Sequence, residues 1–346
     1  MKKILLLHLF AFLLFSCQSK KNKKSLIDNF SFNIPLVNDI DDLLGMNVRT
    51  IQLDTLTKAL VGYVNKIIKH ENSFYILSDG SRILHFDYNG NFISSLDKKG
   101  GGPGEYTMLA DFSVCNRNGK PEIWICDFKS IRKYLLSGSD WNFIENIEFE
   151  FVINKFNIIS DNRILFVTGQ NKESLMLTDI TGKQLGSFLK KKIPFLAMRP
   201  VQFVDYDSCL IFQLGVANEG AALDIQKNSF EIINITNNEY FFTAKKLLNL
   251  FDKLGQDYIR EIPEINCIRG FSKINDNILL DYHYDGERFV AVSQNGVWNR
   301  MKVDINSNPS ISTFCASESF DSFIRFEYHD DDSQNLVLYE HYSDEK

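Results

Sequence analysis

A short apolar pattern recurs along the 346-residue chain. Its copies begin at residues 74, 123, 164, 210, 278 and 323, at spacings of 49, 41, 46, 68 and 45 residues. Each copy is apolar at successive positions, as a strand is when both of its faces are buried. Strands that repeat with a period of about 40–50 residues are typical of β-propeller blades. The sequence therefore predicts an all-β fold, a six-bladed β-propeller.

The connections between these runs carry hairpin signals. Asn89-Gly90, Thr181-Gly182 and Asn295-Gly296 are pairs that form tight turns between antiparallel strands. The segment 47–53 precedes the first copy, and we predict that it supplies a strand to the last blade. Closing the ring in this way removes the open edges that an array of sheets would otherwise leave.

The longest interval, 68 residues, contains a helical pattern. One helical face of the segment 244–254 is apolar, and this face continues past residue 254. Its members are Leu247, Leu250, Phe251, Leu254, Tyr258 and Ile262. Gly255 is expected to divide the helix, and Pro263 to end it. We predict a short helical insertion between the fourth and fifth blades. It is expected to pack against one rim of the propeller; the alternative is a lid over the central channel.

The N-terminus has the pattern of a secretory signal. Lys2 and Lys3 precede an apolar stretch, residues 4–14, that is shorter than the roughly 20 residues needed to span a bilayer. The sequence Leu14-Phe15-Ser16-Cys17 resembles the lipobox of bacterial lipoproteins. The resemblance implies removal of residues 1–16 as a signal peptide and lipidation of Cys17. An ordinary signal peptide with a chance cysteine is the alternative.

The residues after Cys17 bear on location. Gln18 resembles the residue found in lipoproteins sent to the outer membrane. Residues 17–29 are expected to form the lipidated cysteine and a flexible tether, and residues 30–346 the propeller. Four lysines between residues 20 and 24 make the tether basic, so it could rest on anionic headgroups. We expect an outer-membrane lipoprotein of the cell envelope on the periplasmic face, with the lipid-bearing membrane as one partner.

Charge and cysteine content exclude some classes of protein. The net charge of −6 argues against nucleic acid as a partner, because phosphate binding needs a basic surface. The cysteines after Cys17 form no CxxC pair and no zinc spacing. They lie among apolar neighbours and are expected to be small buried side chains, with one disulfide left open.

Two stretches resemble a known family. Residues 83–92 read ILHFDYNGNF and residues 100–106 read GGGPGEY. They resemble the six-bladed β-propeller lipoproteins abundant in Bacteroidetes, relatives of the NHL-repeat propellers. The resemblance covers most of the mature chain and is strongest over residues 60–135. It implies the propeller fold and little about activity, since most members have no established one.

Polar residues repeat at the ends of the predicted strands. Asp79 and Asp127 end equivalent strands of the first two blades, and Arg82 and Arg132 follow at similar offsets. They either cap backbone turns or line a polar ligand site on one rim. Glu105 lies in the Gly-rich run, where it either projects into the channel mouth or belongs to a structural corner, which we favour.

A metal site is a weaker candidate. His283 and His329 occupy nearly equivalent points of the fifth and sixth copies, and Asp281 lies near the first. Imidazoles and carboxylates could together hold a metal, and the carboxylates would favour calcium over zinc. No sequence spacing enforces such a site, so we expect no cofactor.

These observations leave three functions open. The first is a lipid-anchored binding module for a peptide, glycan or protein, and the second is a metal-dependent propeller hydrolase or lyase. The third is a structural partner in an outer-membrane complex. No linear catalytic motif appears, so an enzyme is the less favoured reading. An enzyme predicts ionisable groups with perturbed pKa values in one pocket, whereas a binding module predicts a broad rim with exposed aromatic side chains.

Overall fold

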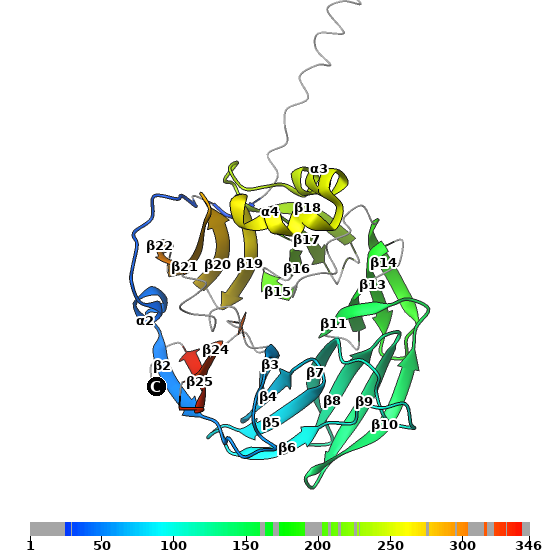
Figure 1. Ribbon diagram of the computed structural model, residues 1–346. Coiled ribbons are helices and arrows are strands. Elements are labelled where there is room, and N and C mark those ends of the chain that lie inside the picture. The colour runs from blue at the N-terminus through cyan, green and yellow to red at the C-terminus, as the bar shows by residue number, and fades with distance from the viewer. Residues whose placement is uncertain are drawn as a thin grey trace, which may run out of the picture.

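The computed structural model describes residues 25–340 apart from 29, 160–162, 169–172, 191–202, 207–208, 214–215, 225–226, 228, 275–276, 295, 304–314, 317–321 and 330. Six small sheets stand in a ring around a common centre (Figure 1). The predicted six-bladed β-propeller is confirmed. Within each sheet, consecutive strands pair antiparallel, and the first strand of each blade lies nearest the centre.

Each of the first three blades is built from four strands that are consecutive in the sequence. Blade 1 holds β3 (Val64–His70), β4 (Ser73–Ser78), β5 (Arg82–Asp87) and β6 (Phe92–Leu96). Blade 2 holds β7 (Asp111–Arg117), β8 (Lys120–Asp127), β9 (Ser130–Ser137) and β10 (Asp140–Glu148). Blade 3 holds β11 (Ile153–Ile159), β12 (Arg163–Thr168), β13 (Glu173–Asp179) and β14 (Gln184–Lys190).

Two of the other three blades, blades 4 and 6, include a strand from the start of the chain. Blade 4 holds β15 (Phe203–Tyr206), β16 (Cys209–Gln213), β17 (Glu219–Asp224), β18 (Ser229–Thr236) and β1 (Ser25–Ile27). Blade 5 holds β19 (Cys267–Ile274), β20 (Asn277–Tyr284), β21 (Glu287–Gln294) and β22 (Val297–Lys302). Blade 6 holds β23 (Cys315–Ala316), β24 (Ser322–Tyr328), β25 (Gln334–Glu340) and β2 (Asn47–Gln52).

The core is divided among the blade interfaces. Six clusters of buried apolar side chains lie in the described part of the chain, and each joins two neighbouring blades. The six predicted repeats coincide with the second strand of each blade, from β4 to β24. Because these strands lie between two neighbouring blades, they bury both faces, which explains their unbroken apolar runs.

The ring closes as predicted. Strand β2 pairs antiparallel with β25, from Asn47 opposite Glu340 to Gln52 opposite Asn335. The buried side chain of Gln334 reinforces the closure: its Oε1 accepts from Val61 N at 2.9 Å and its Nε2 donates to Val61 O at 2.6 Å. The last blade is therefore tied both to the start of the propeller and to the loop that enters blade 1.

The start of the described chain also joins the fold. Strand β1 runs parallel to β18, with Ser25 opposite Asn234 and Ile27 opposite Thr236. Ile27 and Phe30 are buried in the cluster between blades 4 and 5. Residues 25–27 fall within the segment expected to be a tether, so the chain begins to dock before residue 30. Residues 1–24, including Cys17, lie outside the described residues.

The helical insertion follows blade 4. Helix α3 (Ala244–Leu254) begins after Thr243, whose Oγ1 accepts from Lys246 N, and ends at Gly255; α4 (Tyr258–Glu261) follows. Leu247 is fully buried in the cluster between blades 3 and 4. Figure 1 shows both helices over β17 and β18, away from the centre of the ring. This arrangement is the rim packing that we favoured, and it differs from a lid over the centre.

Candidate functional site

One edge of the propeller carries every predicted ligand residue. Because the strands alternate in direction, the loop that enters a blade and the turn between its second and third strands lie on the same edge. We call this edge the entry rim. In the first two blades it comprises residues 53–63, 79–81, 97–110 and 128–129. Hydrogen bonds join the first three segments to one another, and Asp127, next to the fourth, bonds to residues 107–108 of the third.

In blade 1 the predicted residues hold the incoming loop. Asp79 Oδ1 accepts from Tyr63 N at 2.8 Å, and Asp79 N donates to Tyr63 O at 2.8 Å. Arg82 Nη2 donates to Leu60 O at 2.6 Å. The carboxylate and guanidinium therefore fix the backbone of residues 60–63, in which Val61 is buried while Leu60 and Tyr63 are exposed.

Blade 2 repeats the arrangement. Asp127 is buried, and its Oδ1 accepts from Met108 N at 3.0 Å and from Thr107 Oγ1 at 2.9 Å. Its Oδ2 pairs with Arg132 Nε at 2.7 Å. The equivalent aspartates thus hold the two loops in the same way, while the two arginines act differently: Arg82 binds backbone, and Arg132 neutralises Asp127.

The Gly-rich run forms a tight corner between these blades. Glu105 Oε2 accepts from Gly102 N at 2.7 Å, and a Cβ on Gly100 would stand only 2.0 Å from that oxygen. Tyr106 is fully buried, and its hydroxyl donates to Ser81 O at 2.6 Å. Burial also raises the pKa of Tyr106, so the hydroxyl stays protonated as a donor. The corner therefore joins the turn of blade 1 to the loop that enters blade 2.

The same rim exposes apolar side chains that the sequence did not single out. Tyr63 is 70% exposed, Leu56 66% and Phe128 51%, and Leu60 and Met108 are exposed as well. We call these five side chains the rim patch. On the opposite edge, exposed apolar residues such as Ile93, Leu185 and Val297 are spread one to a blade near the start of the outermost strands. Exposed apolar residues follow no sequence period, so the rim patch could be found only once the positions of the loops in the fold were known.

A charged cluster lies on the inner strands. Lys66 Nζ on β3 pairs with Asp111 Oδ1 on β7 at 3.1 Å and donates to Phe112 O at 2.7 Å. Asp111 Oδ2 accepts from Phe156 N on β11 at 3.1 Å, next to Lys155. The sequence reasoning missed these residues because it did not locate the inner strands.

The candidate metal ligands are placed in separate contacts. Asp281 forms a two-point ion pair with Arg288, with distances of 3.0 and 2.8 Å. His283 Nε2 lies 3.2 Å from Arg269 Nη1, and His329 Nε2 lies 2.9 Å from Asn335 Nδ2. Among the described residues, no three His, Cys, Asp or Glu side chains gather where they could hold a metal.

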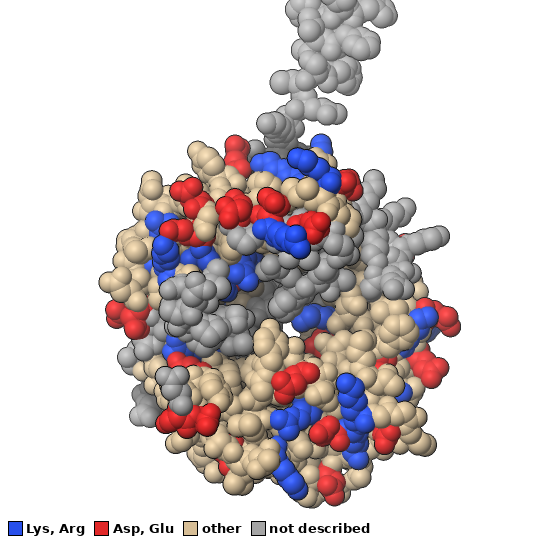
Figure 2. Space-filling model, in the orientation of Figure 1, with Lys and Arg blue, Asp and Glu red and all other residues tan. Residues whose placement is uncertain are grey.

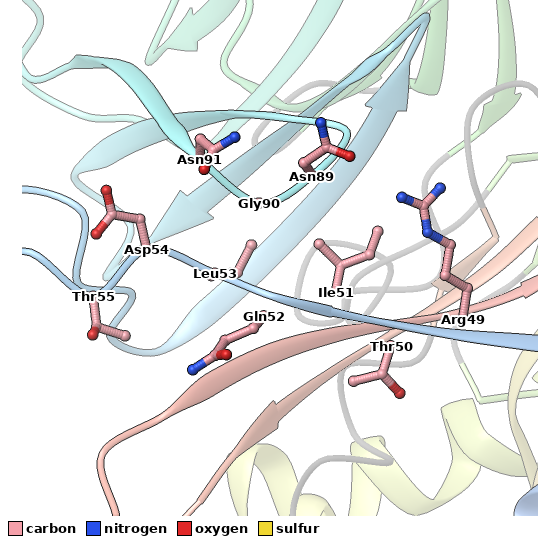
Figure 3. Close-up of a pocket in the computed structure, with 10 residues that line it drawn as sticks. All are labelled: Arg49, Thr50, Ile51, Gln52, Leu53, Asp54, Thr55, Asn89, Gly90 and Asn91. Atoms are coloured by element: carbon pink, nitrogen blue, oxygen red, sulfur yellow. The ribbon is translucent and has the colours of Figure 1, made fainter.

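An open groove of about 560 Å³ lies where the ring closes. It runs between β2 and the β5–β6 turn, and Figure 3 shows Arg49 and Asp54 toward its two ends. Asp54 N donates to Gly90 O at 2.9 Å, and a Cβ on Gly90 would stand 2.1 Å from Gln52 O. Its walls are thus in direct backbone contact, which makes the groove part of the closure between blades 6 and 1.

The described cysteines confirm the expected buried thiols only in part, because Cys115 and Cys209 are of intermediate exposure. Cys115, Cys126, Cys209 and Cys267 are thiols, and Cys126 and Cys267 are buried. Burial raises the pKa of Cys126 well above its usual value, which keeps that thiol protonated and unreactive. The side chain of Cys315 lies outside the described residues.

The sequence matches one family model. The family described as "Domain of unknown function (DUF4934)" matches residues 36–252, more than half of the chain. The chain belongs to the DUF4934 family. Among curated proteins, none matches it. The match spans blades 1–3, most of blade 4 and the closing strand β2.

Two solved structures are similar in fold to this DUF4934 chain. A Bacteroides fragilis NCTC 9343 protein assigned as exported is 14% identical, with a TM-score of 0.67 over 88% of this chain and 97% of that one. A luciferin-regenerating enzyme is 9% identical, with a TM-score of 0.50 over 86% and 96% of the two chains. At these identities the likeness concerns the fold alone.

The helices of the described chain are short. None of them is both long enough and apolar enough to cross a membrane.

Proposed function

We propose that this DUF4934 chain is an envelope-anchored binding module that docks a protein or peptide on the entry rim of blades 1 and 2. One observation carries the proposal: five large, exposed apolar side chains lie on the entry-rim segments of two neighbouring blades, where aspartates hold the loops in place. Grouped exposed apolar side chains mark interaction surfaces, whereas scattered ones are ordinary. Tyrosine and phenylalanine are also frequent anchors of protein interfaces.

Phe128 adds an independent argument. Its backbone has φ = +56°, a conformation in which a bulky side chain is strained. Its side chain nevertheless points to solvent rather than into a core. A strained and exposed aromatic residue is of little use to folding, so a contact outside the chain accounts for it better.

The chemistry of the rim patch favours a protein over a glycan. Leu56, Leu60 and Met108 are aliphatic and offer no hydrogen bonds to sugar hydroxyl groups, which lose free energy when buried without partners. A structural partner in an outer-membrane complex would use the same surface. Among the described residues, no gathering of metal-binding side chains favours the hydrolase or lyase alternative.

The anchor is the lipid on Cys17, and the location is the periplasmic face of the outer membrane. The lipobox sequence supports this, and likeness to a protein assigned as exported agrees with a place in the envelope. A single acyl chain binds a membrane only reversibly, so two or three are needed for a stable anchor. Changing Cys17→Ala should move the protein from the membrane fraction to the soluble fraction and abolish labelling by a radioactive fatty acid. Unchanged labelling would reject the anchor.

The docking proposal is tested by two matched triple variants. Tyr63→Ser/Met108→Ser/Phe128→Gly removes the centre of the rim patch, and Ile93→Ser/Leu185→Ser/Val297→Ser removes three exposed apolar residues of the opposite edge. Each protein is purified from its own envelope after mild crosslinking, and associated proteins are quantified by mass spectrometry. We expect a defined set to fall about tenfold with the first variant alone. Equal losses with both variants, or none with either, would reject the rim as the docking surface.

A further inference from the structure

A sequence element repeats on the inner strands of alternate blades. Val64-Asn65-Lys66 opens β3, and Ile153-Asn154-Lys155 occurs at the same place in β11. In both strands the register shifts across the asparagine, so each lysine follows a β-bulge. Bulges change the direction of a side chain and are frequent beside functional sites. The two lysines are thus placed equivalently, two blades apart.

The inner strand between them begins with Asp111, and the oxygens of its carboxylate are already engaged. Oδ1 accepts from Lys66 Nζ at 3.1 Å and from Phe112 N at 2.9 Å, and Oδ2 accepts from Phe156 N at 3.1 Å. The carboxylate therefore neutralises Lys66 and fixes the start of the two neighbouring strands. It forms no close pair with Lys155, although its charge does act on that residue.

Lys155 is the unsatisfied member of the cluster. Its ammonium forms no hydrogen bond or ion pair with any residue in the described part of the chain, while its side chain keeps intermediate exposure. Surrounding protein lowers the pKa of Lys155, with Asp111 opposing that shift and Lys66 adding to it. A partly buried ammonium without a protein partner keeps only part of its hydration, so a bound anion would stabilise it.

Position and charge define what could bind. All three side chains stand near the starts of inner strands, which face the entry rim and the centre of the ring. Figure 2 shows a hollow at that centre, with Lys or Arg side chains on part of its wall. Taken by themselves, these three described side chains, two ammonium groups and one carboxylate, carry a single positive charge. We infer that the mouth of the channel binds the carboxylate of a small monoanion, with Lys155 as the donor to its oxygens.

The test uses the full-length protein in detergent, labelled with ¹³C-lysine and titrated with sodium acetate at constant ionic strength. The Lys155 signal is assigned by its loss in Lys155→Gln. We expect acetate, but not the neutral acetamide, to shift the Lys155 and Lys66 signals saturably, and inorganic phosphate to bind no more tightly than acetate. Lys155→Gln should weaken the acetate response of Lys66 about tenfold, because a charge-assisted hydrogen bond is lost.

Two controls complete the design. Lys120→Gln, which neutralises an exposed lysine at the opposite edge, should leave acetate binding unchanged. The rim variant Tyr63→Ser/Met108→Ser/Phe128→Gly should also bind acetate normally, since this inference does not depend on docking at the rim. Absence of a saturable Lys155 shift, an equal shift with acetamide, tighter binding of phosphate, or a Lys66 response that survives Lys155→Gln would each overturn it.

Discussion

His85 shows how burial sets the charge of a single side chain. It is 2% exposed, its ring stacks on Tyr75 with centroids 4.3 Å apart, and its Nδ1 lies 3.2 Å from Ser94 Oγ. Desolvation lowers the pKa of His85 to about 4, although the nearby carboxylate of Asp87 opposes the shift. The native state therefore keeps this imidazole neutral at pH values where the unfolded chain binds a proton.

The first prediction concerns acid stability. Between pH 6.5 and about 4 the unfolded state binds more protons at this site, so stability falls as the pH falls through that window. The loss should reach up to about 3 kcal/mol. Urea unfolding at pH 7, 5 and 4 should show a smaller pH dependence for His85→Gln than for the wild type. Identical pH dependence in the two proteins would contradict the account of His85.

The second prediction concerns Phe128. Glycine adopts φ = +56° without strain, so Phe128→Gly should leave the free energy of unfolding unchanged or raise it by up to about 1 kcal/mol. Urea unfolding at pH 7 measures it, with Tyr63→Ser as the exposed control. A loss of more than about 1 kcal/mol would mean that the aromatic ring supports the fold, and would weaken its assignment to docking.

At this scale the sequence reached only part of the candidate site. Asp79 and Asp127 were found because they repeat at strand ends, and the structure brings both onto the entry rim. The sequence analysis did not find the rim patch, because no periodicity marks an exposed loop residue. Lys66 and Lys155 share a repeated tripeptide, but its meaning depends on knowing that both copies lie on inner strands.

At the scale of elements, burial decided which strands could be recognised. The second strands bury both faces and carry unbroken apolar runs, whereas the inner strands face the centre with one side and mix polar and apolar residues. Segment 47–53 could be assigned to ring closure because it lies outside the repeats. The fifth strand of blade 4 was not predicted, since three residues are too few to show a pattern.

The third prediction tests ring closure. Gln334→Leu would leave Val61 N and Val61 O buried without their partner, so the free energy of unfolding should fall by about 2–4 kcal/mol. The control is Asn335→Ala, whose side chain contacts the exposed His329. Urea unfolding measures the free energy of unfolding of the two variants, and only Gln334→Leu should lower it strongly. Equal small effects would show that the Gln334 clamp contributes little to closure.

The fourth prediction tests how α3 is attached. Leu247→Ala should destabilise the protein by about 2–4 kcal/mol, because it leaves a cavity in the cluster between blades 3 and 4. Asn249→Ala, on the exposed side of the same helix, should change stability by less than about 0.5 kcal/mol. A mobile lid would instead give similar, small effects for both variants.

At the scale of the whole molecule, the six blades follow from one repeated physical demand. Each sheet must bury both faces, and a closed ring meets this demand for every blade without open ends. The ring leaves two edges and a centre for function, and in the first two blades the entry rim gathers apolar side chains above a charged mouth. The ring of blades was predicted from the sequence alone. The composition of the entry rim was not, because it depends on how loops from different blades meet.

Docking at the entry rim is tested most directly by photocrosslinking in intact cells. A photoreactive phenylalanine analogue replaces Phe128 in one protein and Val297, equally apolar and exposed on the opposite edge, in another. We predict discrete crosslinked products from position 128, lost when Tyr63→Ser and Met108→Ser are added, and none of these products from position 297. The same products from both positions, or no product from position 128, would contradict the proposal that this propeller docks a partner on its entry rim.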